Sequence, residues 1–176
     1  MGSNSDASND RIVVVTGASR GAGKGIAVAL GQTGATVYVT GRTAGGTAGA
    51  VGTVDDTAAA VTEAGGTGIA VVCDHTDDDQ VRDLFARVAD DHGKLDILVN
   101  NATAIPAGLT DRKPFWEKSL DQIDILDVGM RSHYVASYHA APLLIADGGG
   151  LVVNTSSPGG RCYMHGPAYG AGKAAI

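Results

Sequence analysis

Short apolar runs alternate with segments of helical periodicity along the whole chain. Five runs rich in β-branched residues have the pattern of strands buried on both faces. These runs span residues 11–17, 35–42, 68–74, 95–102 and 150–157. The segments with apolar residues at helical spacing span residues 26–30, 54–61, 81–88 and 120–145. Strands that alternate with helices predict right-handed crossovers, and therefore a doubly wound parallel α/β sheet with helices on both faces.

The composition fits one domain of this kind. A chain of 176 residues is long enough for one hydrophobic core and too short to expect two. The 26 glycines, with only 5% aromatic residues, indicate many tight turns. Residues 43–53, rich in glycine and threonine, predict a mobile loop. Residues 1–10 predict a disordered tail, which leaves residues 11–176 for the folded domain.

Charge and cysteine content narrow the expected partners and location. The 19 acidic and 13 basic residues give a formal charge of -6, and no basic cluster could neutralise a run of phosphates, so nucleic acid is not an expected partner. No apolar run approaches the roughly 20 residues of a membrane span, and the N-terminus lacks the order of a secretion signal. Cys73 and Cys162 stand alone, which favours reduced thiols in a cytoplasmic protein over disulfides or a metal site.

The turn after the first strand has the character of a phosphate site. In a doubly wound sheet, ligands bind beyond the carboxyl ends of the strands. The sequence "TGASRGAGKGIA" places Gly17, Gly21 and Gly23 there, where missing side chains let a pyrophosphate approach backbone N–H groups and the positive end of a helix. The rival is a P-loop, G-x-x-x-x-G-K-[ST]. It is excluded because Ala18 replaces its first glycine and Gly25 its Ser/Thr.

Three motifs together resemble the short-chain dehydrogenase/reductase family. They are the glycine turn, "NNA" after the fourth strand, and a serine about a dozen residues before a Tyr-x-x-x-Lys pair, Tyr169 and Lys173. The resemblance runs from about Arg11 to the last residue. The stretches "FWE", "VGMRSHY" and "SSPGG" are similar to the branch that contains dehydrogenase/reductase SDR family member 1. The resemblance implies a Rossmann-like fold and an NAD(P)(H)-dependent oxidoreductase acting on a small-molecule carbonyl or alcohol.

The resemblance implies that Ser157, Tyr169 and Lys173 are the catalytic residues. The tyrosine would exchange a proton with the substrate oxygen while nicotinamide exchanges hydride, and Ser157 would hydrogen-bond that oxygen, with Ser156 the weaker candidate. A free phenol, with a pKa near 10, suits this poorly at neutral pH, and an ammonium one helical turn away favours the phenolate. A lone Tyr-x-x-x-Lys pair is usually a solvated pair on a helix surface, but the glycine turn and the serine after the fifth strand favour a catalytic role here.

The end of the second strand bears on the choice of cofactor. An enzyme selective for NAD usually has an Asp or Glu there, which binds the ribose 2′-hydroxyl. This chain has Gly41 and Arg42 instead, and Arg20 in the glycine turn could reach the same 2′-phosphate, so NADP(H) is preferred over NAD(H). The resemblance implies a cofactor site of Gly17, Ser19, Arg20, Gly21, Gly23, Arg42, Asp74 (adenine), Asn101 and Ala102 (adenine ribose), Tyr169 and Lys173.

Two positions depart from the family pattern. Thr103 follows "NNA" where the family usually has glycine, and we expect it to be tolerated. The family asparagine that holds a relay water near the lysine has no clear counterpart, because counting back from Tyr134 places Gly129 there and Asp127 lies two residues earlier. The relay role is therefore unassigned. This gap supports the alternative of a non-catalytic dinucleotide-binding sensor or scaffold, whereas the intact Ser157, Tyr169 and Lys173 argue against it.

Three further expectations follow from the resemblance. Family domains run roughly 250 residues, so the chain is expected to be incomplete at its C-terminus and to stop before the last strands. A homodimer or homotetramer is implied, with residues 133–145 apolar enough for part of its interface. Tyr163, Met164 and His165 are candidate substrate contacts, with Phe115 and Trp116 near the entrance, and an apolar carbonyl compound fits them.

Overall fold

The structure, a computed structural model, describes residues 11–176; the predicted disordered tail of residues 1–10 lies outside the described residues. The described part contains a parallel five-stranded sheet in the order β3-β2-β1-β4-β5. The strands are β1 (Ile12–Val15), β2 (Thr36–Gly41), β3 (Thr67–Val72), β4 (Ile97–Asn100) and β5 (Leu151–Asn154). The predicted fold class is confirmed, and each strand ends somewhat before the predicted run does.

Strand β1 is central because its side chains are buried on both faces. Val14 packs with Tyr38 and Leu98 in one core cluster. Val13 and Val15 point to the other face, into a second cluster. Successive side chains of a strand point to opposite faces, so a run that is apolar at every position belongs between two layers of helices.

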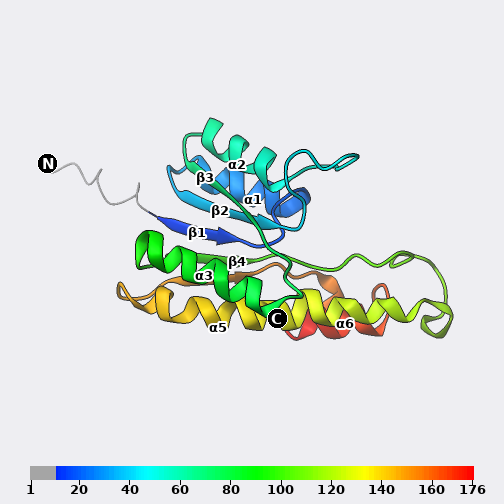
Figure 1. Ribbon diagram of the computed structural model, residues 1–176. Helices are drawn as coiled ribbons and strands as arrows, with labels where there is room; N and C mark the ends of the chain where they lie inside the picture. The colour runs from blue at the N-terminus through cyan, green and yellow to red at the C-terminus, as the bar shows by residue number, and fades with distance from the viewer. Residues whose placement is uncertain (1–10) are drawn as a thin grey trace, which may run out of the picture.

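Helices supply those two layers (Figure 1). The longer helices are α1 (Gly21–Gly31), α2 (Val54–Glu63), α3 (Asp78–His92), α5 (Ser132–Ile145) and α6 (Pro167–Ala174). Helices α1 and α2 cover one face of the sheet, and α3 and α5 cover the other. The shorter elements are η1 (Phe115–Glu117), η2 (Leu120–Ile123), α4 (Asp124–Leu126), η3 (Asp127–Arg131) and η4 (Pro158–Gly160). Between residues 11 and 176, no helix has the length and apolar character needed to cross a membrane.

The longest predicted helical segment, residues 120–145, is interrupted, which corrects the expectation of helical periodicity throughout. Val128 (φ −108°, ψ 90°) and Gly129 (φ 141°) leave the helical conformation. The backbone N–H of Ala104, in the loop after β4, donates to Val128 O over 2.7 Å. Gly129 N donates to Ser132 Oγ over 3.2 Å. The break depends on Gly129, because side chains rarely tolerate such a positive φ.

The strand order creates a crevice where function is expected. From β1 the chain proceeds outward through β2 to β3, and then crosses to the other side of β1 to form β4 and β5. The connections after β1 and β4 therefore diverge at the carboxyl edge of the sheet. Every cofactor or catalytic residue predicted from the sequence follows one of the five strands at this edge, or lies on α6 just after β5.

Candidate active site

The residues just after β4 hydrogen-bond to the glycine turn between β1 and α1 and stabilise it. Gly17 has φ 63°, and a Cβ there would lie 2.7 Å from the Cα of Ala102, so only glycine fits. The Asn101 side-chain amide donates to Thr16 O (2.9 Å) and Gly17 O (3.0 Å). The backbone N–H groups of Asn101 and Ala102 both donate to Thr16 Oγ1. The structure thus brings together the predicted residues Gly17, Asn101 and Ala102. The Asn101 side-chain amide stabilises the turn through its two hydrogen bonds.

The first turn of α1 is open to an anion. Its N-cap, Arg20, makes no side-chain capping hydrogen bond, and Gly21, the first helical residue, is exposed. The N–H groups of a first helical turn have no partner within the helix and can bind an anion. Ser19 lies against the end of β2, where a Cβ on Gly41 would be 3.6 Å from Ser19 Oγ. Arg20 and Arg42 are both exposed, and neither forms an ion pair within residues 11–176. The turn therefore combines helix-end donors with two available guanidinium groups.

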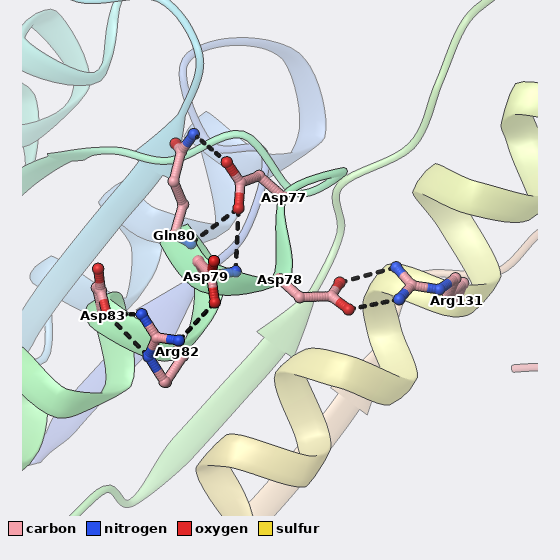
Figure 2. Close-up of polar contacts among 7 residues, drawn as sticks. All are labelled: Asp77, Asp78, Asp79, Gln80, Arg82, Asp83 and Arg131. Carbon is pink, nitrogen blue, oxygen red and sulfur yellow. Dashed lines mark hydrogen bonds and ion pairs between the residues drawn. The ribbon is translucent and has the colours of Figure 1, made fainter.

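Carboxylates make a network of polar contacts in the loop after β3, which contains Asp74, and at the start of α3, where Figure 2 shows them. Asp74 Oδ1 accepts hydrogen bonds from the backbone N–H and the hydroxyl of Thr76. Asp77 caps α3 by accepting from the N–H groups of Asp79 and Gln80, and from the Gln80 amide. Asp78 forms a two-pronged ion pair with Arg131, just before α5. This pair links the predicted adenine loop to the interruption at Gly129; sequence analysis did not predict it.

The predicted catalytic residues converge at the carboxyl end of β5. The Tyr169 hydroxyl, on α6, donates to Ser157 Oγ over 2.9 Å. Ser157 Oγ also accepts from Gly159 N over 3.2 Å. Ser156 is engaged elsewhere, because its hydroxyl donates to Lys173 O over 3.1 Å. The geometry thus places Ser157, and not Ser156, against the phenol.

Lys173 anchors α6 to the same loop. Lys173 is buried, and its Nζ donates to Thr155 O over 3.1 Å. Burial lowers the pKa of Lys173 below its ordinary value. One of the three ammonium donors is used by Thr155 O, which leaves two for a ligand or water.

Two buried histidines lie under this edge of the sheet, and sequence analysis missed both. His133, on α5, shares a hydrogen bond of 3.0 Å between Nε2 and Ala102 O. Burial, followed by the nearby charge of Lys173, lowers the pKa of His133. His75, after β3, lies with Nε2 2.8 Å from Thr40 Oγ1, and its burial lowers its pKa to about 4. A signal existed for His133, which shares one helix face with Ala136 and other buried residues at helical spacing; none existed for His75.

The two departures from the family pattern meet in space. A Cβ on Gly129 would lie only 3.0 Å from Thr103 Oγ1 and 3.7 Å from Thr103 Cβ. Gly129 is buried at the interruption before α5, while the Asp127 side chain is exposed. The glycine therefore makes room for the threonine, and neither residue offers a side-chain amide for a relay water.

An apolar groove of about 650 Å³ opens beside Tyr169. Its walls are Phe115, Trp116 and Leu120 from the segment before α4, and His165 to Tyr169 at the start of α6. The His165 ring contacts the Tyr169 ring edge to face, with centroids 5.1 Å apart. Of the predicted substrate contacts, Phe115, Trp116 and His165 thus line the groove, whereas Tyr163 and Met164 do not.

Comparison with known proteins gives a consistent result. A sequence model of the short chain dehydrogenase family matches residues 11–176. Dehydrogenase/reductase SDR family member 1 of Mus musculus is 45% identical over 94% of the chain, and 3beta-hydroxysteroid dehydrogenase of Mediterraneibacter gnavus is 33% identical over 96%. The chain spans about half the length of these relatives, 52% and 57%.

A solved structure supports the same assignment. A metagenomic short-chain oxidoreductase in complex with NADP superposes with a TM-score of 0.78 at 30% identity, covering 93% of this chain and 70% of that one. The resemblance drawn from the sequence motifs, including the SDR family member 1 branch, is confirmed.

Proposed function

Because the chain belongs to the short-chain dehydrogenase/reductase family, we propose that it forms the dinucleotide site and the proton-transfer set of an NAD(P)(H)-dependent oxidoreductase. The reaction is reduction of a carbonyl group or oxidation of the matching alcohol. The observation that carries the proposal is the 2.9 Å hydrogen bond from Tyr169 to Ser157 Oγ, at the rim of the apolar groove. Lys173 follows one helical turn later.

Each residue of the set has its own part in the reaction. A bound nicotinamide dinucleotide supplies hydride to the carbonyl carbon, or accepts it from the alcohol. Tyr169 gives its hydroxyl proton to the substrate oxygen in reduction and takes a proton from it in oxidation. Ser157 Oγ accepts from Tyr169 and from Gly159 N, so its own hydrogen remains available to donate to the substrate oxygen and orient it. Lys173 favours the phenolate and holds the nicotinamide ribose with its remaining donors.

The residues present fit a dinucleotide with a 2′-phosphate. Gly17 leaves a cradle that a side chain would fill, and the start of α1 has free N–H groups. The end of β2 carries no carboxylate to repel a phosphate, while Arg20 and Arg42 are exposed nearby. The solved relative that binds NADP is consistent with this choice. These features support NADP(H) as the proposed preferred cofactor.

The proposal includes a homodimer or homotetramer with α5 in its interface. Tyr134 and Ile145 are both 72% exposed on this helix, whose opposite side packs on the sheet through Ala136 and Ala140. A helix with apolar residues on both sides suits burial between the sheet and a second copy of the chain.

The test of function is Tyr169→Phe. The variant removes one oxygen, so it should bind NADPH as the parent does yet lose carbonyl reduction by about 10²-fold or more. NADPH oxidation is followed against a panel of aldehydes, ketones and quinones, with NADPH affinity measured in parallel. Tyr138→Phe, which removes the hydroxyl of a tyrosine on α5 that does not line the groove, is the matched control. Parent-like turnover by Tyr169→Phe would contradict the catalytic assignment and favour the non-catalytic sensor.

A further inference from the structure

A second hollow of different character adjoins the apolar groove. This hollow, of about 290 Å³, shares Lys118, His165 and Gly166 with the groove. It is also lined by Asp111, Arg112, Lys113 and Tyr163. The two spaces therefore adjoin at the three residues they share, and a ligand long enough to cross them would have one end beside Tyr169 and the other in the hollow. We call it the basic hollow because three of its lining side chains are cationic and one is anionic.

The charge of the basic hollow contrasts with the rest of the chain. The chain carries a formal charge of -6, whereas Arg112, Lys113 and Lys118 gather here against the single carboxylate of Asp111. That carboxylate lies 3.6 Å from Lys113 Nζ and offsets one charge. Arg112 is exposed and forms no ion pair with any residue from 11 to 176. Its guanidinium is therefore available to an anionic oxygen group, which it can bind through two parallel hydrogen bonds.

Hydrogen bonds and ring packing fix Lys118 and His165, which line both spaces. Lys118 Nζ donates to Leu109 O over 2.8 Å and to His165 O over 3.1 Å, which ties the loop after β4 to the start of α6. His165 has φ 60°, and it is the only described residue other than glycine with a positive φ. Its ring contacts Tyr169, so the strained backbone is fixed from both sides. The distance from the phenol to the basic hollow is thus set by packed and hydrogen-bonded groups.

We infer that the substrate is an amphipathic carbonyl compound or alcohol whose apolar body lies in the groove and whose far end carries a carboxylate bound by Arg112 in the basic hollow. The inference rests on the proposed function for its reacting end at Tyr169. It extends that function, because the apolar groove alone would accept neutral carbonyl compounds equally well. Arg112 is then a specificity-determining residue.

A binding experiment tests the inference without requiring turnover. With NADPH present, calorimetry compares a medium-chain alkanoate with the primary amide of the same chain length. The parent should bind the carboxylate about fivefold or more tightly than the amide, as expected for a charge-assisted contact at a partly exposed site. In Arg112→Gln the two affinities should become nearly equal. Arg82→Gln, which alters an exposed arginine of α3 outside the groove, should keep the parent's preference.

A kinetic arm separates this inference from the proposed function. For ω-oxo carboxylates against their methyl esters, Arg112→Gln should raise KM for the acid selectively and leave kcat within about twofold. Equal binding of carboxylate and amide by the parent, or a preference that survives Arg112→Gln, would overturn the inference. Failure of the proposed function would give a different result, because carbonyl reduction would then be unaffected by Tyr169→Phe.

Discussion

Acid should destabilise the fold through His75, and the structure gives the size of the effect. The imidazole is buried after β3, with Nε2 at 2.8 Å from Thr40 Oγ1 and Nδ1 without a hydrogen-bond partner among the described residues. Burial is the main reason that its pKa falls from 6.5 to about 4; the neighbouring His133 lowers it further, while Asp74 opposes the change. His75 therefore stays neutral in the folded protein at pH values where an unfolded chain would protonate it.

The sign and magnitude follow from proton linkage. Above pH 6.5 neither state binds the proton, and the stability associated with neutral His75 is fully present. Between pH 6.5 and about 4 the unfolded state binds more protons, so the free energy of unfolding falls as the pH falls. At about 1.4 kcal/mol for each pH unit, the loss over this window is about 3 kcal/mol. His133, whose pKa is also lowered, adds a loss of the same sign.

Urea unfolding followed by far-UV circular dichroism, at pH values from 7.5 to 4, measures this dependence. The single tryptophan, Trp116, is 72% exposed and would report poorly by fluorescence. His75→Gln keeps a polar group near Thr40 but cannot titrate, so its stability should fall by about 3 kcal/mol less than the parent's over the same range. His92→Gln, at the exposed end of α3, should follow the parent. Parallel profiles for the parent and His75→Gln would refute the reasoning.

Two further predictions concern the cofactor site and the interruption before α5. Arg42→Ala should weaken NADPH binding by about 1.5–3 kcal/mol and leave NADH binding nearly unchanged, since one charge-assisted contact to the 2′-phosphate is lost. Fluorescence titration measures both affinities, and equal affinities for NADPH and NADH in the parent would contradict the NADP(H) preference. Gly129→Ala should lower the free energy of unfolding by about 1–3 kcal/mol, because φ is 141° and the new Cβ would press on Thr103. Thermal denaturation measures the change in stability, and Gly25→Ala, whose Cβ would lie in open space on α1, is the control.

The sheet could be predicted because its strands carry a simple signal. Each strand is short, apolar and rich in β-branched residues, and the central β1 is apolar at every position. The predicted runs extended too far at their carboxyl ends, where residues such as Thr16, Asn101 and Thr155 continue the run but form the edge of the site. A polar residue that ends a strand and one that lines a ligand crevice look alike in the sequence, so the pattern does not fix the carboxyl end of a strand that borders the site.

The contacts between distant segments could not be predicted in the same way. The Tyr-x-x-x-Lys spacing indicated that Tyr169 and Lys173 share a helix face, and the family resemblance alone favoured Ser157. That the Ser157 hydroxyl meets the phenol while the Ser156 hydroxyl donates to Lys173 O is visible only in the structure. The basic hollow combines the loop after β4 with the start of α6, held together by Lys118 through two carbonyl groups. Backbone carbonyls carry no sequence signature, so this junction is visible only in three dimensions.

The departures from the family pattern show why single positions can mislead. From the sequence, Thr103 was an added side chain in one loop, and Gly129 was a missing side chain in a helix. In the structure the two residues are neighbours, because a Cβ on Gly129 would lie only 3.0 Å from Thr103 Oγ1. At the same interruption, Val128 O accepts a hydrogen bond from Ala104 N. Restoring a side chain at Gly129 would therefore disturb the loop that follows Asn101 and Ala102, which support the glycine turn.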